Sequence, residues 1–321
     1  MKTKGRPGSR DANIGIWRKS ATVPKRSVKN WRLGRGPPSL LNRTMRGWRW
    51  KWIGGERASD RKVPAPVLLI RDRALEEAIR RDRIDLRFQP QIEPGSGHVM
   101  GVEALARWSG ASSPEEMFAR AHAAGLSERL SRAIQRKALR TAAKWRGPLA
   151  RLRLSINLLP RDLERAGYEH WLLDEIAAAG LSPGRVTVEI VENSLVADSE
   201  EVACRLASLR SAGLRIAIDD FGTGYSSLAY LTTLPIDAIK IDRAMIADIV
   251  GGSRDRIVVK AMIGMARELG LKVIVEGVES MAQLQILAEW GCDLYQGFLG
   301  AGALDEAELA RFVETAERSA A

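Results

Sequence analysis

The sequence predicts an α/β protein built as a (β/α)₈ barrel, and three observations support this class. Eight short apolar runs alternate with amphipathic stretches from about residue 66 onward. A polar side chain stands in or at the end of most of these runs. This part of the chain has about the length of one such barrel, although length alone would also permit two lobes.

Residues 1–65 differ from the rest in charge and composition. Through Lys62 the chain has 18 basic and 3 acidic residues, a net charge of +15, whereas the remainder carries −4 of the total of +11. Five of the nine tryptophans lie here, with little Leu, Ile or Val, so the segment cannot bury enough apolar surface to fold. We predict a disordered basic tail, rich in Trp and Arg, followed by the barrel over residues 66–321.

Two other interpretations of the tail stay open. Tryptophan between arginines, as in residues 46–52, suits stacking on nucleic-acid bases or contact with a membrane surface. The same composition is also typical of an untranslated GC-rich leader read from a wrong start codon.

The predicted strands are short apolar runs of five to seven residues. In chain order they are 85–91, 101–106, 152–157, 186–190, 214–219, 237–241, 272–276 and 294–298.

Amphipathic spacing predicts helices between these strands. One helix begins after Ser113, which acts as the cap, with Pro114 at the first position and a Glu able to reach back. Two apolar faces at helical spacing are Leu130, Ile134, Ala138 and Ala142, and Ile257, Met262, Met265 and Leu269.

Neither cysteine belongs to a metal-binding or disulfide pattern. Cys204 and Cys292 are far apart and have no CxxC partner, so we expect buried free thiols. No apolar run is long enough to span a bilayer and no secretory signal is present, so a cytoplasmic setting is expected. The three histidines, His98, His122 and His170, are expected on the surface.

Polar residues at the strand ends predict one shared site. A single carboxylate after an apolar run is usually a helix cap or a surface charge. Seven polar residues on different strands are hard to explain in that way, because a barrel gathers these ends around one mouth. They are Glu103, Asn157, Glu189, Asp219, Lys240, Glu276 and Gln296.

The residue types at this mouth indicate a site for hard divalent cations. Its carboxylates, with Asp220 beside Asp219 and the amide oxygen of Asn157, offer only oxygen ligands, which suits Mg²⁺ or Mn²⁺ rather than zinc. So many converging anions would repel one another without cations, and there are enough of them to hold two metals.

Two further features adjoin this cluster. Lys240 and Asp242 share a strand face, where the ammonium can orient water or stabilise phosphate charge; the alternative is a strand-end salt bridge. Residues 220–227 form a glycine-containing loop opened by two adjacent aspartates, which favours a role in positioning metal or sensing ligand.

The ordered motifs of this part of the chain resemble those of the EAL-domain cyclic-di-GMP phosphodiesterases, over about residues 70 to 300. Any one motif is weak, whereas the set in family order is specific. The motifs are Phe88-Gln89-Pro90, Glu103-Ala104-Leu105-Ala106-Arg107-Trp108, Ser155-Ile156-Asn157, Glu189-Ile190-Val191-Glu192, Asp219-Asp220-Phe221-Gly222-Thr223-Gly224, Lys240-Ile241-Asp242, Glu276-Gly277-Val278-Glu279 and Gln296-Gly297-Phe298.

The resemblance implies a TIM-like barrel in which the first strand can run antiparallel, and metal-dependent hydrolysis of cyclic di-GMP to linear pGpG. It implies that Lys240 positions the attacking water and that the loop after Asp220 couples the site to a homodimer. The resemblance further implies one metal on Glu103, Asn157, Glu189 and Asp219, and a second metal on Asp219, Asp220 and Glu276. It implies that Gln89, Arg107 and Gln296 contact the substrate or order its pocket. Glu192 and Glu279 are implied to anchor the loop, and Asp242 to support the site.

Two other functions remain as alternatives. One is a catalytically weak or inactive cyclic-di-GMP receptor that acts through a protein partner, and the other is a barrel enzyme for a different phosphorylated substrate. The sequence departs from the family pattern at Val191, Val275, residues 300–303 and Ala123-Ala124. None of these departures removes an implied metal ligand.

Overall fold

A computed structural model describes residues 71–192, 200–223, 230–252 and 254–320 of the chain. The predicted basic tail and its boundary at residue 65 lie outside these residues. No helix in the described ranges combines the length and apolar character needed to cross a membrane.

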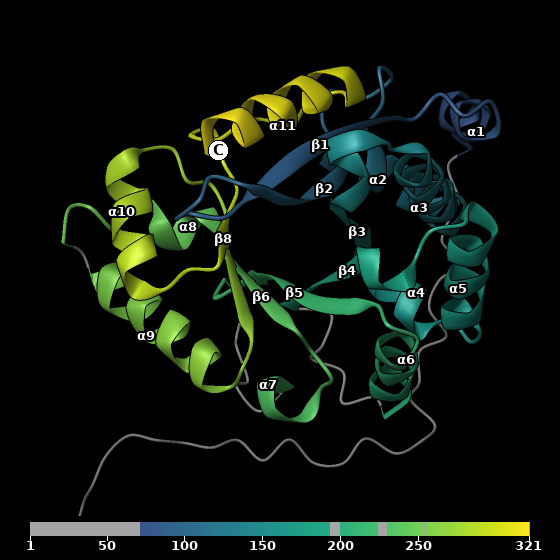
Figure 1. The fold of residues 1–321 in the computed structure, drawn as a ribbon. Coiled ribbons are helices and arrows are strands. Elements are labelled where there is room, and N and C mark those ends of the chain that lie inside the picture. Colours follow the sequence, from purple (N-terminus) through teal and green to yellow (C-terminus); the bar gives the residue numbers. More distant parts are fainter. Residues whose placement is uncertain (1–70, 193–199, 224–229, 253, 321) are drawn as a thin grey trace, which may run out of the picture. The chain divides into compact units, whose positions relative to one another are not determined.

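Eight strands in the described residues close into a barrel in sequence order (Figure 1). The strand β1 is antiparallel to both of its neighbours and all other neighbouring pairs are parallel. This confirms the predicted (β/α)₈ class with an antiparallel first strand. The strands are β1 (Asp85–Ile92), β2 (Val99–Arg107), β3 (Arg153–Leu158), β4 (Val186–Val191), β5 (Arg215–Phe221), β6 (Ala238–Ile241), β7 (Lys272–Val275) and β8 (Leu294–Tyr295).

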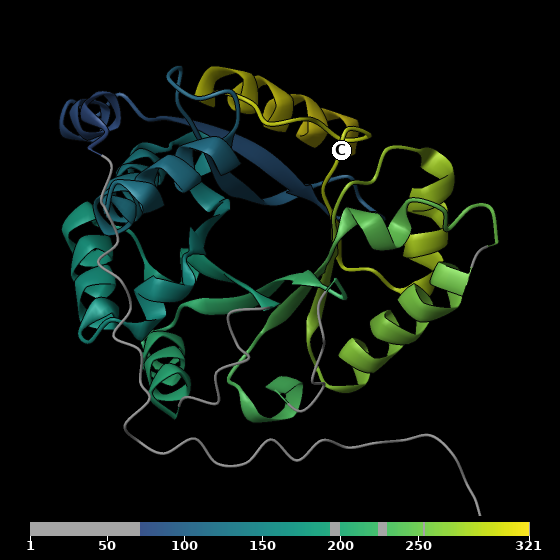
Figure 2. The same cartoon turned by 180° about the vertical axis from the view of Figure 1, so that it is seen from behind.

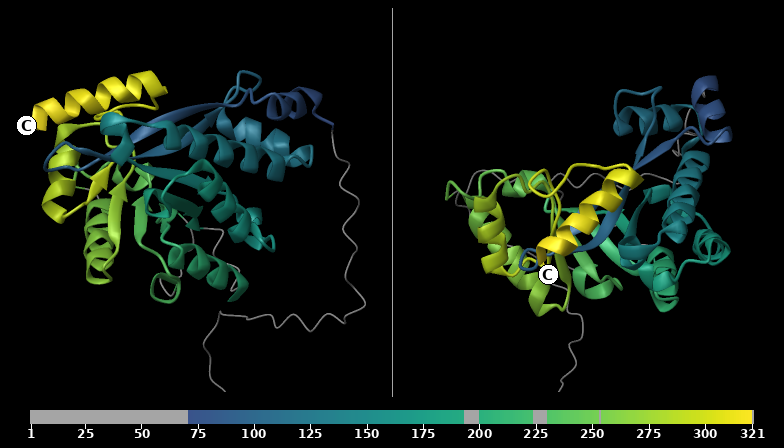
Figure 3. Two further views of the ribbon diagram at one scale, coloured as in Figure 1. Left: turned by 45° about the vertical axis from the view of Figure 1, so that its right-hand side comes forward. Right: turned by 45° about the horizontal axis from the view of Figure 1, so that its top comes forward.

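Helices surround this barrel, and α11 packs along β1 (Figures 2 and 3). The helices within the described ranges are α1 (Arg73–Arg80), α2 (Pro114–Ala123), α3 (Ser127–Lys144), α4 (Pro160–Glu164), α5 (Tyr168–Ala179), α6 (Glu200–Ser211), α7 (Tyr230–Thr233), α8 (Arg243–Ile246), α9 (Arg254–Glu268), α10 (Met281–Trp290) and α11 (Glu306–Ala320), with the 3₁₀ turns η1 (Gly147–Arg151) and η2 (Pro183–Arg185).

Local signals explain where α2 begins. Ser113 is its N-cap, and the hydroxyl accepts a hydrogen bond from the backbone N–H of Glu116. Pro114 takes the first helical position, where its missing N–H costs nothing. The predicted start is confirmed: the Glu115 carboxylate is hydrogen-bonded to the Ser113 hydroxyl, and the Glu116 carboxylate reaches back to the backbone N–H of Ser112.

The predicted apolar face of α9 is wrong in part. Ile257 is 72% exposed and Leu269 is 41% exposed. The helix instead buries Val259, Ile263 and Ala266, whose face lies about a third of a turn away from the predicted one. Apolar residues occur on both faces of this helix, so periodicity alone does not decide which face meets the barrel.

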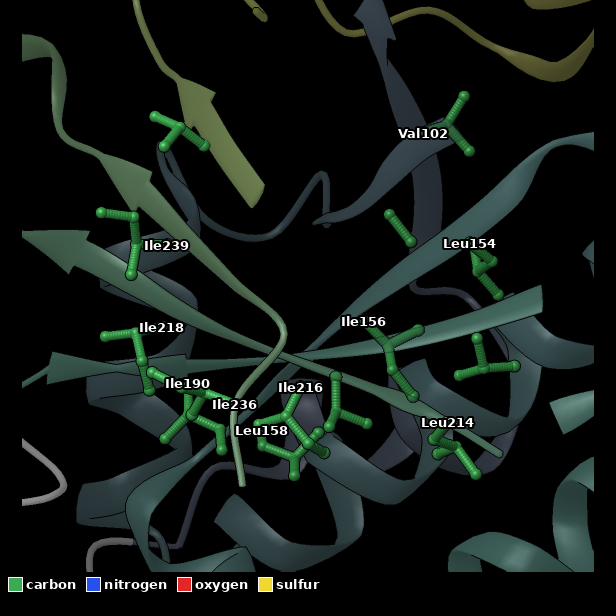
Figure 4. Close-up of a cluster of buried hydrophobic side chains, with 14 of the residues drawn as sticks. Val102, Leu154, Ile156, Leu158, Ile190, Leu214, Ile216, Ile218, Ile236 and Ile239 are labelled. Atoms are coloured by element: carbon green, nitrogen blue, oxygen red, sulfur yellow. The ribbon is translucent and has the colours of Figure 1, made fainter. Parts of the chain in front are cut away.

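The hydrophobic core lies between the barrel and its helices (Figure 4). Successive side chains of a strand point to opposite faces. In β5, Ile216 and Ile218 are fully buried in this core, while Ala217 and Asp219 face the barrel interior. The core therefore supports each strand from outside and leaves the inner face free for polar side chains.

The two cysteines differ in burial. Cys292 is buried and its thiol contacts the carbonyl oxygen of Leu294 at 2.8 Å, as expected for a core thiol. Cys204 is exposed, so its predicted burial is wrong. It lies on α6 opposite the face that buries Val202 and Leu206. The histidines are exposed, as predicted.

Candidate active site

Lys240 stands at the centre of an acidic cluster in the barrel mouth. Its side chain is 1% exposed, and the strand β6 that carries it lies between β5 and β7. The ammonium Nζ contacts carboxylate oxygens of four residues from four other strands or strand ends: Glu103 at 3.2 Å, Glu189 at 2.7 Å, Asp219 at 2.9 Å and Glu276 at 2.8 Å. Barrel closure thus brings together residues predicted to share one site.

Side-chain amides orient two of these carboxylates. Asn157 Nδ2 donates to Glu103 Oε1 at 2.8 Å. Gln296 Nε2 donates to Glu103 Oε2 at 2.9 Å and to Glu276 Oε1 at 2.8 Å. With both amides and Lys240 as donors, Glu103 is held in one position at the base of the mouth.

Gln91 is a member of this network that sequence reasoning missed. Its amide Nε2 lies 3.4 Å from Glu189 Oε1 and 3.4 Å from Gln296 Oε1. The sequence does contain a signal for Gln91, because Gln89 and Gln91 are two residues apart on one strand and therefore share a face. The buried Gln91 closes the floor beneath the carboxylates.

The carboxylates differ in how their environment affects proton binding. Burial raises the pKa of Glu189 well above its ordinary value, and burial raises that of Glu276 to about 7, in both cases against the attraction of Lys240. Burial also opposes ionisation of Glu103, but Lys240 and the two amides hold its pKa below the ordinary value.

Lys240 responds in the opposite sense. Its burial disfavours the charged form, yet the surrounding carboxylates raise its pKa well above the usual range. One ammonium cannot balance several carboxylates, so the cluster has an excess of negative charge.

Asp220 extends the cluster beyond the end of β5. Its backbone is left-handed, with φ at 56°, which is uncommon for a residue other than glycine. Its backbone N–H donates to Asp219 Oδ1 at 3.1 Å. Burial and then the neighbouring Asp219 raise the pKa of Asp220. The turn therefore holds two carboxylates side by side despite their repulsion.

The acidic residues form two groups with the spacing of metal ligands. Within each group, one carboxylate oxygen per residue lies within 4.8 Å of the others; the groups are Glu103, Glu189 and Asp219, and Asp219, Asp220 and Glu276. All donors are oxygens, and Asp219 belongs to both groups. Because hard divalent cations prefer oxygen donors and the cluster has unbalanced negative charge, these residues fit a hard divalent cation better than zinc.

The loop that follows Asp220 is tied to the neighbouring strand end. Glu192 is buried and its Oε2 accepts a hydrogen bond from the backbone N–H of Gly222 at 2.9 Å. Glu279 is exposed, and its backbone N–H donates to Gln283 Oε1. Residues 224–227, the rest of the predicted loop, lie outside the described part of the chain.

In the described part of the chain, Asp242 does not form a strand-end salt bridge with Lys240, which was the alternative interpretation of this pair of residues. Its Oδ1 accepts from the backbone N–H of Ala244 at 2.8 Å, so it caps α8. The ammonium of Lys240 is instead directed at the four carboxylates.

A cleft of about 550 Å³ opens beside the acidic cluster. Gln89 and Arg107 line it together with Asn157, which also contacts Glu103. Arg243, at the first position of α8, adds a second guanidinium that sequence reasoning did not single out. The cleft wall thus contains two arginines and one acid, Glu115, whose pKa is lowered by the hydroxyl of Ser113 and also by Arg107 and Arg243. Asn157 connects this cleft to the carboxylate cluster.

The fold and the site together define a (β/α)₈ barrel with an acidic, oxygen-only cluster at the strand ends. The chain belongs to the EAL domain family, whose model matches residues 72–303.

Known relatives agree with this assignment. The chain is 37% identical over 256 residues to the cyclic di-GMP phosphodiesterase NbdA and 36% identical over 218 residues to the cyclic di-GMP phosphodiesterase PA2567, both from Pseudomonas aeruginosa. These matches cover 78% and 67% of this chain but only 33% and 37% of the relatives, so the chain spans about a third of their length.

Solved structures show the same fold. The PaMucR phosphodiesterase in complex with c-di-GMP has a TM-score of 0.69 and 32% identity, over 73% of this chain and 97% of that one. The manganese and cyclic-di-GMP complex of BlrP1 from Klebsiella pneumoniae has a TM-score of 0.63 and 34% identity, over 69% of this chain and 56% of that one.

Proposed function

We propose that this protein hydrolyses cyclic di-GMP to linear pGpG with the help of two divalent cations, Mg²⁺ or Mn²⁺. The observation that carries the proposal is the pair of carboxylate groups that share Asp219 around the buried Lys240. Family membership and the phosphodiesterase names of the relatives support the choice of substrate.

The proposed ligand sets follow the two carboxylate groups. Glu103, Glu189 and Asp219, with the amide oxygen of Asn157, would hold one cation, and Asp219, Asp220 and Glu276 would hold the other. When bound, the cations supply Lewis acidity that activates water and stabilises charge on the phosphate. The hydrogen bonds of Gln296 and Gln91 keep the carboxylates oriented for this task.

Lys240 is the residue we assign to positioning the nucleophile. Its ammonium is held among the carboxylates and stays charged because they raise its pKa. Such a fixed donor can orient an attacking water and stabilise negative charge that develops on the phosphate. In the overall reaction the water oxygen joins phosphorus, one phosphorus–oxygen bond to ribose breaks, and the leaving ribose oxygen receives a proton.

The cleft beside the cluster is the proposed substrate site. Cyclic di-GMP carries two phosphodiester anions, and Arg107 and Arg243 line this cleft. Gln89 adds an amide to the same wall, while Gln296 orders the carboxylates rather than facing the open cleft. We also propose that Glu192 and Glu279 order the loop after Asp220 and that this loop couples the site to a homodimer.

A turnover assay on the full chain tests the proposal. With Mn²⁺ or Mg²⁺, cyclic di-GMP should be converted to pGpG, measured by chromatography of the nucleotides. Glu103→Gln should lower the rate by at least about 100-fold, since it replaces an anionic ligand with a neutral amide at the centre of the site. Glu289→Gln, at an exposed position on α10, should retain activity.

The same assay separates the alternatives. Saturable binding of cyclic di-GMP without turnover in the presence of metal would assign the chain as a receptor. Neither binding nor turnover at high protein concentration would refute the proposal and favour a different phosphorylated substrate.

A further inference from the structure

A second cavity lies at the end of the barrel opposite the acidic cluster. It encloses about 140 Å³ and is lined by residues from the amino-terminal ends of the parallel strands. Arg153 is the first residue of β3, Arg215 the first of β5 and Lys272 the first of β7. These three cations converge on a space that the proposed reaction does not use.

Strand register directs the two arginines into the barrel. Arg153 lies two residues before the interior Ser155, and Arg215 lies four residues before Asp219 on the inner face of β5. Thr187 on β4 is paired with Ser155 on one side and with Arg215 on the other. The guanidinium groups therefore flank Thr187 at the bottom of the barrel.

The acids around this cavity are already engaged with other groups. Asp293 Oδ1 pairs with Lys272 Nζ at 2.6 Å. Asp237 Oδ1 pairs with Arg210 Nη2 at 2.9 Å, and its Oδ2 accepts from the backbone N–H of Ile216. The remaining acid, Glu93, is exposed and accepts a hydrogen bond from the hydroxyl of Ser96.

Arg153 and Arg215 have no carboxylate partner among the residues that the structure describes. Burial and then repulsion from Arg215 lower the pKa of Arg153. Two like charges held together in a partly buried space are unfavourable unless an anion joins them.

We infer that this cavity is a binding site for a phosphate group, either the free ion or a small phosphate monoester. Guanidinium groups match the oxygens of phosphate with paired hydrogen bonds, and the hydroxyl of Thr187 is a further donor at the wall. The lining also contains Met100, Ile274 and Leu294, which suit the apolar part of a monoester.

The site lies one layer of side chains below the proposed catalytic cluster. Gln91 and Ser155 line the cavity, and Gln91 also contacts Glu189 and Gln296. The inference does not depend on the proposed function, because phosphate binding at these arginines can be measured without metal or cyclic di-GMP.

The test uses the full chain in EDTA and titrates orthophosphate by calorimetry, with chloride keeping the ionic strength constant. Wild type should show one saturable phosphate site, and the double variant Arg153→Gln with Arg215→Gln should lose at least about tenfold in affinity, as expected when paired charged hydrogen bonds are removed. The control Arg73→Gln with Arg140→Gln removes the same charge from exposed positions and should bind as wild type does. The basic tail is identical in all three proteins, so it cannot cause a difference.

A thermal measurement gives an independent readout. Without phosphate, the Arg153 and Arg215 double variant should be at least as stable as wild type, because the repulsion is gone. Phosphate should raise the Tm of wild type and of the control pair but not of this variant. If the double variant does not fold, the single variant Arg215→Gln takes its place in both measurements and should show an intermediate loss of phosphate affinity.

Phenyl phosphate as the second titrant distinguishes the two sources of the ligand. If phenyl phosphate binds more tightly than orthophosphate, and this binding depends on Arg153 and Arg215, the ligand of the site is a monoester. If phenyl phosphate binds more weakly, the ligand is the free phosphate ion. Absence of saturable phosphate binding by wild type, or equal affinity in the Arg153 and Arg215 variants, would overturn the inference.

Discussion

At the scale of single residues, Lys240 keeps a positive charge inside the barrel, away from water. It is fully buried, and four carboxylates contact its ammonium within 3.2 Å. Removing one partner of a buried charge network leaves the others uncompensated, which is costlier than losing an exposed pair. The same lysine thus serves the stability of the metal-free protein and, in our proposal, the reaction.

Lys240→Met should therefore destabilise the protein in EDTA by about 3–5 kcal/mol. Mn²⁺ should restore much of that loss, because divalent cations supply the missing positive charge. Urea unfolding with and without Mn²⁺ measures both effects, and Lys260→Met on the exposed face of α9 is the control. Equal stability of Lys240→Met and wild type in EDTA would contradict this electrostatic account.

Asp162 is a buried carboxylate outside the candidate site. It accepts hydrogen bonds from the hydroxyl of Ser131 at 2.5 Å and from the backbone N–H of Leu159 at 3.2 Å. Burial nevertheless raises its pKa above the ordinary 3.8. Between 3.8 and the raised pKa, the folded protein keeps a proton that the unfolded chain has lost, so the stability contributed by this group falls as the pH rises through that window.

Asp162→Asn removes this titration. The stability of the variant relative to wild type should increase as the pH rises from 4 and level off above the pKa of the folded state. Urea midpoints between about pH 4 and 7 measure the difference, with the exposed Asp174→Asn as a control that should show no such trend. A difference that does not vary with pH would disagree with the raised pKa.

At the scale of elements, α8 and α10 are joined by one glutamine. The Ser280 hydroxyl accepts from the backbone N–H of Gln283, and Gln283 Oε1 accepts from the backbone N–H of Ser280, which forms a capping box. The amide Nε2 of Gln283 also donates to the carbonyl oxygen of Ile246 at the end of α8. One side chain therefore starts α10 and holds the turn that follows Glu276.

Gln283→Ala should lower the free energy of unfolding by about 1–3 kcal/mol, since it leaves buried backbone groups without partners. Denaturant unfolding measures the loss. Gln285→Ala on the same helix is exposed and should cost little, so a similar loss in both variants would argue against the specific role of Gln283.

At the scale of the whole molecule, charge is distributed unevenly. The net charge of +11 contains +15 from the residues through Lys62, and the remainder carries −4. The candidate site is itself acidic, whereas cyclic di-GMP is a dianion. In our proposal, attraction between them therefore requires the charge of bound cations as well as the arginines of the cleft.

EDTA should weaken binding of cyclic di-GMP in addition to stopping turnover. Calorimetric titrations of the full chain in Mn²⁺, in Mg²⁺ and in EDTA measure the affinity directly. Affinity that is unchanged in EDTA would count against the two-cation assignment while leaving the fold and family untouched.

The fold was largely predictable because its signals are local. Each strand is an apolar run bounded by polar residues, and seven of the eight predicted ranges agree with observed strands to within two residues at each end. The last strand is shorter, since it ends at Tyr295 and the carbonyl oxygen of Gln296 instead accepts from Val278. Strand pairing rather than composition decides such an ending.

Sequence alone determined which polar residues stand at the strand ends and the class of cation that their oxygens suit. Only the tertiary structure decided that Lys240 occupies the centre, that Gln91 closes the floor, and which face of α9 is buried. It also placed Arg153 beside Arg215 at the far end. Residue patterns are local, whereas these contacts join positions as distant as Glu103 and Gln296, which meet only when the barrel closes.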